Sequence, residues 1–286
     1  MTTLDEKIKN FRESINNYDR ANMTSLLAKH GIGLEQYIEI VVSEVKNNDK
    51  LLEAFVINPN SMFASILFAA EIGLMPNEKL GEFYLIPRNI KQTENGKEKW
   101  LLTVTPLIGY KGMVKLILRS GDIKRLHAEV VYEGDEFTPK YGLEPDIIHV
   151  PNFNVERTAD KIKYSYAVAK NSNGEYHFTV LTRKEIEAVR DTQSNKNKLY
   201  FNDEKGINRW MEKKTALIQL AKLLPIDYHT RMAIGYDGAI EAGAYLSLDE
   251  QKKPMLIENK EATFQKFKKG RDIYGEFAKA TKHDRK

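Results

Sequence analysis

The sequence contains no cysteine, which excludes disulfide bridges, thiolate metal sites and cysteine nucleophiles. No apolar run approaches the roughly 20 residues that a membrane-spanning helix requires. Residues 1–20 carry acids among their bases and have no apolar core, so they do not look like a secretion signal. Together these absences predict a cytoplasmic protein without membrane segments.

The motifs of several large enzyme classes are also absent. There is no G-x-x-x-x-G-K-[ST] loop for nucleotide phosphates, no dinucleotide-binding glycine pattern and no G-x-S-x-G nucleophile elbow. The six histidines include no pair at i, i+4, so a zinc site has little support. The sequence therefore predicts no catalytic residue, no bound metal and no cofactor.

The positive charge of the chain is concentrated at its end. Residues 247–286 carry eleven Lys and Arg against seven Asp and Glu, which accounts for the whole formal net charge of +4. Apolar residues become sparse there, which predicts a mobile basic tail over 241–286. Because the rest of the chain is formally neutral, any argument for nucleic-acid binding rests on local clusters of bases.

Apolar periodicity predicts an N-terminal helical lobe over 1–65 and a mixed core over 66–240. Residues 34–45 have apolar side chains at helical spacing, and 58–73 form a nearly all-apolar helix that packs on the core or on another subunit. The pattern of the core predicts a hairpin of 82–88 with 99–106, a helix over 106–120, a strand over 123–132, a hairpin of 161–170 with 175–181, and helices over 183–192 and 207–225. The fold class is therefore α+β.

The predicted helix over 106–120 carries a basic ridge. Lys111, Lys115 and Arg119 are four residues apart, so they lie on one face and span about 12 Å of helix axis. Such a ridge can follow successive phosphates of an extended strand, because each contact releases counterions. An ordinary solvated helix face explains the spacing equally well.

The second basic helix, over 207–225, favours the phosphate interpretation. It holds Arg209 and Lys213 among other bases, and it places Lys214 on its apolar stripe. Burying a lysine costs several kcal/mol unless it is paired or its end reaches water or a ligand. A groove that presents Lys214 to phosphate is our preferred hypothesis, and a lysine that extends to solvent is the alternative.

Aromatic and polar residues near these bases complete the predicted groove. Tyr110 and Tyr200 are candidates for stacking on nucleic-acid bases, although most aromatics in this region, Trp210 in particular, fit the core better. Arg88 and Thr105, on the two strands of the first hairpin, are candidates for one wall.

In their order and spacing, three segments of the sequence resemble the RecT family of phage and prophage recombinases: 107–137 "LIGYKGMVKLILRSGDIKRLHAEVVYEGDEF", 141–151 "YGLEPDIIHVP" and 210–225 "WMEKKTALIQLAKLLP". The likeness extends over about 66–225. It implies a small antiparallel or mixed β-sheet with hairpins, crossed by a long helix and flanked by the helical lobe. It also implies an oligomeric ring or helical filament.

The resemblance further implies an ATP-independent single-strand annealing protein of phage recombination, which binds single-stranded DNA and the annealed duplex and needs no cofactor. A partner exonuclease supplies the single strand. Lys111, Lys115 and Arg119 fall within one family motif, and Lys213 and Lys214 within another, so all five are expected DNA contacts. We also expect the tail to recruit a host single-strand-binding protein or the exonuclease, in the cytoplasm of a bacterial cell.

The charge of the chain reverses between two adjacent segments. Residues 107–127 carry five bases and one acid, whereas 129–146 carry six acids and one base. One hypothesis is that the acidic segment meets the next subunit of an oligomer, and a solvated acidic loop is the alternative. Reversing the charges of Glu133, Asp135 and Glu136 would then weaken assembly more than monomer stability.

Two other functions remain open at this point. Glu144 to Asp146 followed by Asp160 to Lys163 faintly resembles the acid cluster of a magnesium-dependent nuclease, but the spacing is loose. A structural phage oligomer would associate with itself without binding nucleic acid.

Overall fold

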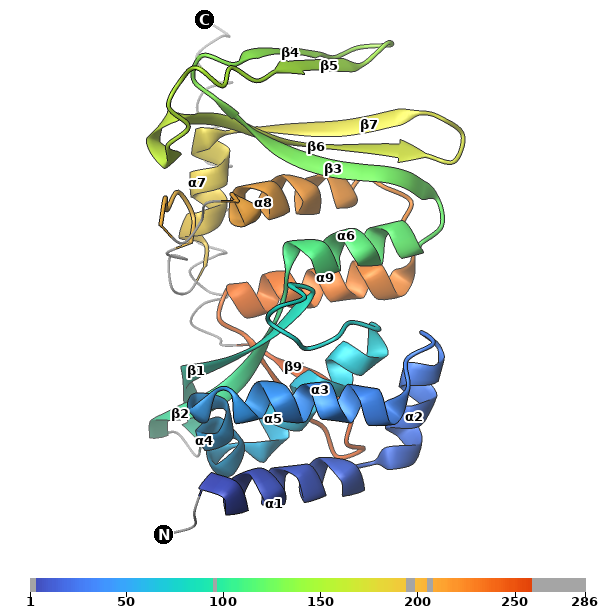
Figure 1. Cartoon of the computed structure of the whole chain (residues 1–286), viewed down its shortest axis with the longest axis vertical. Helices are drawn as coiled ribbons and strands as arrows, with labels where there is room; N and C mark the ends of the chain where they lie inside the picture. Colours follow the sequence, from blue (N-terminus) through green and yellow to red (C-terminus); the bar gives the residue numbers. More distant parts are fainter. Residues whose placement is uncertain (1–3, 95–96, 194–198, 205–207, 259–286) are drawn as a thin grey trace, which may run out of the picture.

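A computed structural model describes residues 4–94, 97–193, 199–204 and 208–258 (Figure 1). The chain begins with helices that form the lower part of the molecule in this view: α1 Leu4–Asn17, α2 Arg20–Ala28, α3 Leu34–Lys46, α4 Asp49–Ile57 and α5 Pro59–Glu71. The helices α3 and α5 confirm the two predicted there. No single described helix is long and apolar enough to cross a membrane, and α4 and α5 pass that test only as a pair bent by 114°.

The first hairpin is longer than predicted. β1 Phe83–Glu94 pairs antiparallel with β2 Lys97–Ile108, from Phe83 opposite Ile108 to Glu94 opposite Lys97. The predicted turn at Asn95 and Gly96 lies outside the described residues. Helix α5 is fastened to β2 because Val104 N donates to Ser61 Oγ at 3.0 Å. The extra strand length places the base of the hairpin directly before α6 Tyr110–Arg119.

A three-stranded antiparallel sheet, in the order β3–β6–β7, forms the upper part of the molecule (Figure 1). Its strands are β3 Ile123–Tyr132, β6 Ile162–Asn171 and β7 Tyr176–Thr182, and the short 3-10 helix η1 Ala159–Lys161 leads into β6. Helix α8 Trp210–Ala221 crosses one face, where Ser165 Oγ of β6 donates to Glu212 O at 3.0 Å. The predicted strand, hairpin and crossing helix are all present.

A second hairpin covers the other face of this sheet. It consists of β4 Glu136–Lys140 and β5 Asp146–Val150, neither of which was predicted from the sequence. The Phe137 ring packs against the rings of Tyr164 and Tyr166 on β6, with centroids 5.4 and 5.5 Å apart. The sheet therefore has a covered face on each side.

The end of the described chain contains more structure than predicted. After α7 Arg183–Asp191 and α8 come α9 Tyr228–Glu241 and a hairpin of β8 Tyr245–Leu248 with β9 Pro254–Ile257. The hairpin packs on α5, and Leu246 is completely buried. The prediction of a mobile tail from 241 is therefore wrong as far as residue 258, because these apolar side chains join the core; residues 259–286 lie outside the described part.

One hydrophobic cluster runs through these layers. It includes Phe11 and Tyr37 of the N-terminal helices, Phe83 of β1, Ile117 of α6 and Leu220 of α8. The fold is α+β with small antiparallel sheets, as predicted. The proposed division at residues 65 and 240 stays a prediction.

Candidate nucleic-acid interface

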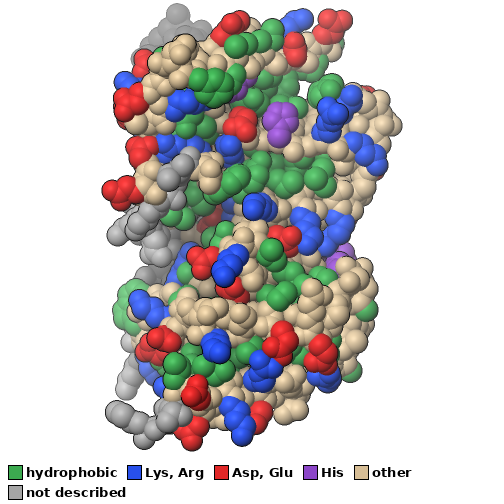
Figure 2. Space-filling model, in the orientation of Figure 1, with side chains coloured by type: hydrophobic (Ala, Val, Ile, Leu, Met, Phe, Trp, Pro, Cys, Tyr) green, Lys and Arg blue, Asp and Glu red, His purple; other side chains and the backbone are tan. Residues whose placement is uncertain are grey.

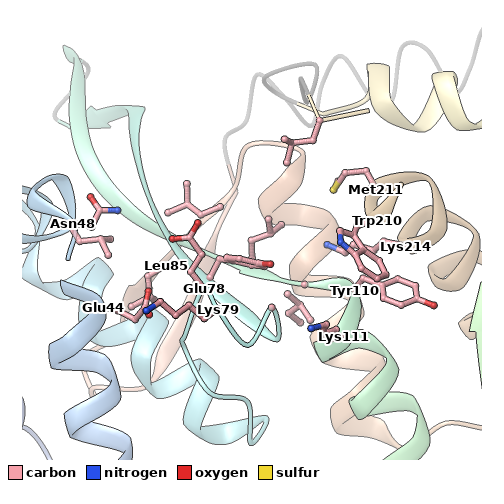
Figure 3. A pocket seen from close by; sticks show the side chains of 18 of the residues that line it. Glu44, Asn48, Glu78, Lys79, Leu85, Tyr110, Lys111, Trp210, Met211 and Lys214 are labelled. Carbon is pink, nitrogen blue, oxygen red and sulfur yellow. The ribbon is translucent and has the colours of Figure 1, made fainter. Parts of the chain in front are cut away.

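A cleft of about 710 Å³ opens between the N-terminal helices and the layer of α6 and α8 (Figure 3). The first turns of α6 and α8 form one wall. The end of α3, the start of α4 and the segment 78–81 form the other, and the base of the β1–β2 hairpin closes the cleft between them. Figure 3 shows Tyr110, Lys111 and Trp210 on one side, facing Glu44, Asn48 and Lys79.

Two glycines bring α6 against the segment that precedes β1. A Cβ atom at Gly109 would lie 2.2 Å from Gly81 O, and one at Gly112 would lie 2.1 Å from Glu82 O. Neither distance admits a side chain, so both positions require glycine. This close packing explains the glycines of the 109–112 motif, and it holds Tyr110 and Lys111 at the cleft.

An exposed aromatic surface lies on the α6–α8 wall. Trp210 is 41% exposed, and its ring centroid lies 5.0 Å from that of Tyr110. The hydroxyl of Tyr110 accepts a hydrogen bond from Ala128 N on β3, at 3.3 Å, which fixes its ring. Lys213 Nζ lies 5.6 Å from the Trp210 ring centroid. The sequence analysis favoured the core for Trp210, whereas the structure presents its indole ring to solvent.

The three bases of the α6 ridge have different surroundings. Lys111 is exposed, lines the cleft and has no ion-pair partner among the residues that the structure describes. Lys115 pairs with Glu82 at 2.8 Å and is 42% exposed. Arg119 donates to Ile72 O at 2.7 Å and so ties α6 to the end of α5. Only Lys111 of the three therefore presents an uncompensated charge at the cleft.

Lys214 is held by carboxylates. Its Nζ lies 2.6 Å from Asp237 and 3.0 Å from Glu241, and the residue is 3% exposed. Burial acts to lower the pKa of Lys214, but the two carboxylates outweigh it and raise the pKa above its usual value. The preference for a phosphate contact is thus corrected: this lysine on an apolar stripe is paired inside the protein.

The same cluster perturbs its acids and a nearby arginine. Burial raises the pKa of Asp237 to about 6, although Lys214 acts to lower it. One lysine can neutralise only one of the two carboxylates, so for Asp237 the effect of burial on the pKa is larger than the opposing effect of Lys214. Arg88 is half-buried near the cluster, and burial lowers its pKa although Glu241 and Asp237 act to raise it.

The wall opposite α6 carries acids that the sequence analysis did not consider. Glu44, at the end of α3, and Glu78 line the cleft beside Lys79. Burial raises the pKa of Glu44, and the charge of Glu78 acts in the same direction. The two walls therefore differ in charge: Lys111 lies on the α6–α8 wall, whereas two acids, Glu44 and Glu78, lie on this one.

Comparison with known proteins places this cleft in a family. The family model for the RecT family matches residues 35–270, which include both walls of the cleft. Over 220 residues the chain is 33% identical to Protein RecT of Escherichia coli strain K12, and the match covers 76% of each chain. The chain belongs to the RecT family. It is therefore a DNA-binding protein of recombination and strand annealing.

The RecT match is longer than the resemblance seen in the sequence. It begins within α3 and continues beyond β9, whereas the quoted motifs lie within about 66–225. The helices that form the acidic wall therefore belong to the RecT region, whereas residues 1–34 lie outside the match.

Three predicted contacts lie in the interior of this RecT-family chain. Thr105 is 1% exposed and donates its hydroxyl to a carbonyl of β1 at 3.1 Å. Tyr200 is 6% exposed, and its hydroxyl lies 2.7 Å from that of Thr215. Arg209 is 4% exposed and donates to Asp203 at 2.5 Å. These residues stabilise the interior, so their prediction as contacts on a groove surface is wrong.

The acidic segment is largely engaged within the chain. The side chain of Asp135 is completely buried, with a bidentate partner in Arg157 at 2.7 and 3.3 Å. Glu133 faces two lysines at the start of β6. Glu129 pairs with Lys213 at 2.7 Å. Reversing the charge of Asp135 is therefore not a valid test of assembly, because the change would break an ion pair inside the chain.

The alternative function, a magnesium-dependent nuclease, would need a cluster of metal-binding side chains. Within the described ranges of this RecT-family chain, no group of three or more His, Asp or Glu side chains is placed to hold a metal ion. Asp146 begins β5, opposite Lys140, and Asp160 lies in the 3-10 helix before β6.

Proposed function

We propose that the chain anneals complementary single strands of DNA without ATP, and that it binds the first strand along the α6–α8 wall. One observation carries the proposal: the uncompensated Lys111 lies on the same wall as the exposed ring of Trp210. A cation for the phosphate and a flat face for the base are what a sequence-tolerant single-strand site requires. The absence of a P-loop in the sequence supports independence from ATP.

The remaining bases of this wall extend the site. Lys115 is 42% exposed, and Lys213 keeps a 16% exposed side chain beside Trp210. Lys115 can exchange its carboxylate partner for a phosphate at small cost, because exposed ion pairs contribute little. The contacts are to the backbone and the faces of the bases, which leaves the base edges free to pair.

The proposal includes partners beyond the single strand. We propose that the chain retains the annealed duplex and that copies assemble into a ring or helical filament in the cytoplasm of a bacterial cell. An exonuclease supplies the single strand, and the tail beyond residue 258 recruits that enzyme or a host single-strand-binding protein. The RecT membership and the basic composition of the tail support these assignments.

The test is annealing of two complementary fluorescent oligonucleotides without ATP, with and without EDTA, across a salt series. Lys111→Glu should slow annealing because it places an acid on the phosphate path. Trp210→Ala should weaken single-strand binding by about 1–3 kcal/mol, the contribution of one stacked base. Lys184→Glu on α7 is the matched control, because Lys184 is exposed and outside the cleft.

Each outcome of this assay has a clear meaning. EDTA-resistant annealing that both cleft variants impair, and that the control leaves intact, supports the proposal. Oligonucleotides shortened only in the presence of metal would replace it with a nuclease. Annealing that neither cleft variant alters would show that DNA binds elsewhere on the molecule.

A further inference from the structure

Four residues form a basic and aromatic surface at one end of the three-stranded sheet; we call Arg125, His127, Lys170 and Tyr176 the sheet-end patch. Arg125 lies opposite Lys170, which in turn lies opposite Tyr176, so the three side chains share one face of the sheet. His127 is two residues along β3 on the same face.

The charges of this patch are not neutralised by the fold. Arg125 and His127 are exposed, and neither Arg125 nor Lys170 has an ion-pair partner in the described part of the chain. Lys170 Nζ lies 4.9 Å from the ring centroid of Tyr176, which remains 51% exposed.

The acids closest along these strands do not reach the patch. Glu129, two residues beyond His127 on β3, is engaged by Lys213 at 2.7 Å. At the other end, Glu175 accepts from Asn171 Nδ2 at 2.7 Å. Asp122 is exposed at the turn before β3. The patch therefore combines free cations with an exposed ring.

Strand β3 connects the patch to the cleft. Ala128 N donates to the hydroxyl of Tyr110, the residue that packs beside Trp210. Arg125 is three residues from Ala128, about 10 Å along the strand, so its side chain lies on the opposite face, the one that β4 and β5 partly cover. Because β3 is an edge strand of the sheet, a DNA strand would pass around this edge to reach the patch. Figure 2 shows Lys and Arg side chains gathered on the right-hand side of the molecule, at the height of the sheet and of α6 in Figure 1.

We infer that the sheet-end patch is a second binding site for single-stranded DNA, on the path of a strand that leaves the cleft along β3. Arg125 and Lys170 bind its backbone phosphates, and the Tyr176 ring stacks on a base. Cations for the phosphates beside a ring that can stack on a base are the combination that a sequence-tolerant single-strand site uses, so the patch favours nucleic acid. The inference rests on the proposed function, since it extends the site in the cleft.

The test compares the wild type with the double variant Arg125→Gln/Lys170→Gln on strands of two lengths. Removing one cation that binds a phosphate of a single strand lowers the slope of log K against log salt by about 0.7, so removing two lowers it by about 1.4. A slope lower by about 1.4 means that, relative to 1 M salt, the double variant gains about 25-fold less affinity at 0.1 M salt than the wild type does. We expect that decrease on a strand of roughly 40 nucleotides, several times the usual site size.

A strand of about 3 nucleotides, too short to extend from the cleft to the patch, should bind equally to both proteins. Lys184→Gln on α7 removes a charge from an exposed position outside both sites and should leave both slopes unchanged. Thermal unfolding should be the same for all variants, because the altered side chains lie at the surface.

The outcomes separate this inference from the proposed function. An unchanged slope on the long strand, with short-strand binding weakened by Lys111→Glu, would overturn the sheet-end site and leave the cleft in place. If the wild type bound neither strand, the proposed function itself would fail. If the double variant kept its affinity but formed smaller assemblies in mass photometry, the patch would be a protein contact instead.

Discussion

Replacing Lys214 with methionine would remove the cation from a buried cluster of charges. The Lys214 side chain is 3% exposed and lies between Asp237, which is completely buried, and Glu241, which is 12% exposed. Methionine keeps most of the aliphatic volume, so the effect is mainly electrostatic. Removing one partner of a buried ion pair costs about 3–5 kcal/mol because the other charge remains buried. We expect the free energy of unfolding to fall by that amount at neutral pH.

The destabilisation should depend on pH in a defined direction. Burial raises the pKa of Asp237 to about 6 even with Lys214 opposing it, and Lys214→Met removes that opposition. A group whose folded pKa exceeds its unfolded value stabilises the fold at low pH, and this contribution is lost as the pH rises through the folded pKa. The deficit of Lys214→Met should therefore be smaller at pH 5 than at pH 8, measured by urea unfolding followed with circular dichroism.

A second substitution makes the test specific. Asp237→Asn combined with Lys214→Met removes one of the uncompensated charges and keeps an oxygen to accept from Ile108 N, now 2.8 Å from Asp237. The double variant should recover part of the lost stability. The reasoning would be refuted if Lys214→Met unfolded like the wild type at both pH values and bound single strands with a reduced salt slope, because the lysine would then contact phosphate.

Two further predictions concern stability. Asp135→Asn should destabilise the fold by about 2 kcal/mol at pH 7, since burial acts to raise the pKa of Asp135 but hydrogen bonds, first from Arg157, lower it to about 2. Because this pKa is depressed, the contribution is full above about pH 4 and disappears as the pH falls through about 2, which acid unfolding measures. Gly112→Ala should cost about 1–3 kcal/mol, because the added Cβ would lie 2.1 Å from Glu82 O and force the backbone apart.

Each of these has a contrasting outcome. A deficit of Asp135→Asn that persists unchanged at pH 2 would show that the charge of Asp135 is not what stabilises the fold. For Gly112, the control is Gly235→Ala in α9, where no atom lies within 4 Å of the added carbon and alanine should stabilise by up to about 1 kcal/mol. Equal melting temperatures of the two alanine variants would contradict the close packing at α6.

Elements with strong local patterns were predictable from the sequence. Strand β3 runs from Ile123 to Tyr132 as expected, because Gly121 precedes it and the β-branched residues Ile123, Val130 and Val131 lie at its two ends. The hairpin of β4 and β5 was missed because each strand has only 5 residues and Pro139 lies within β4. Helix α9 was not predicted, and its two glycines, Gly235 and Gly238, lower its helical propensity.

Residues of the site could be predicted only where the position of a side chain on its own helix decides whether it is exposed. The spacing of Lys111 on α6 indicated a base on an open face, and the structure places it at the cleft. The partner of Lys214 could not be predicted, because Asp237 is 23 positions away in sequence, on α9, and meets the lysine of α8 only in the folded chain. Likewise, nothing local to the segment around Glu44 indicates that α3 lines the cleft.

The two walls of the cleft are made at different times. Residues 44–111 leave the ribosome about 100 residues before Trp210 and Lys214, which takes several seconds at roughly 5–20 residues per second. The carboxylates that hold Lys214 follow later still, in α9. A nascent chain therefore carries one wall of the cleft without the other while about 100 residues are added. The proposed strand site is complete only after α8 and α9 have emerged, so we expect a nascent chain to bind DNA there only late in its synthesis.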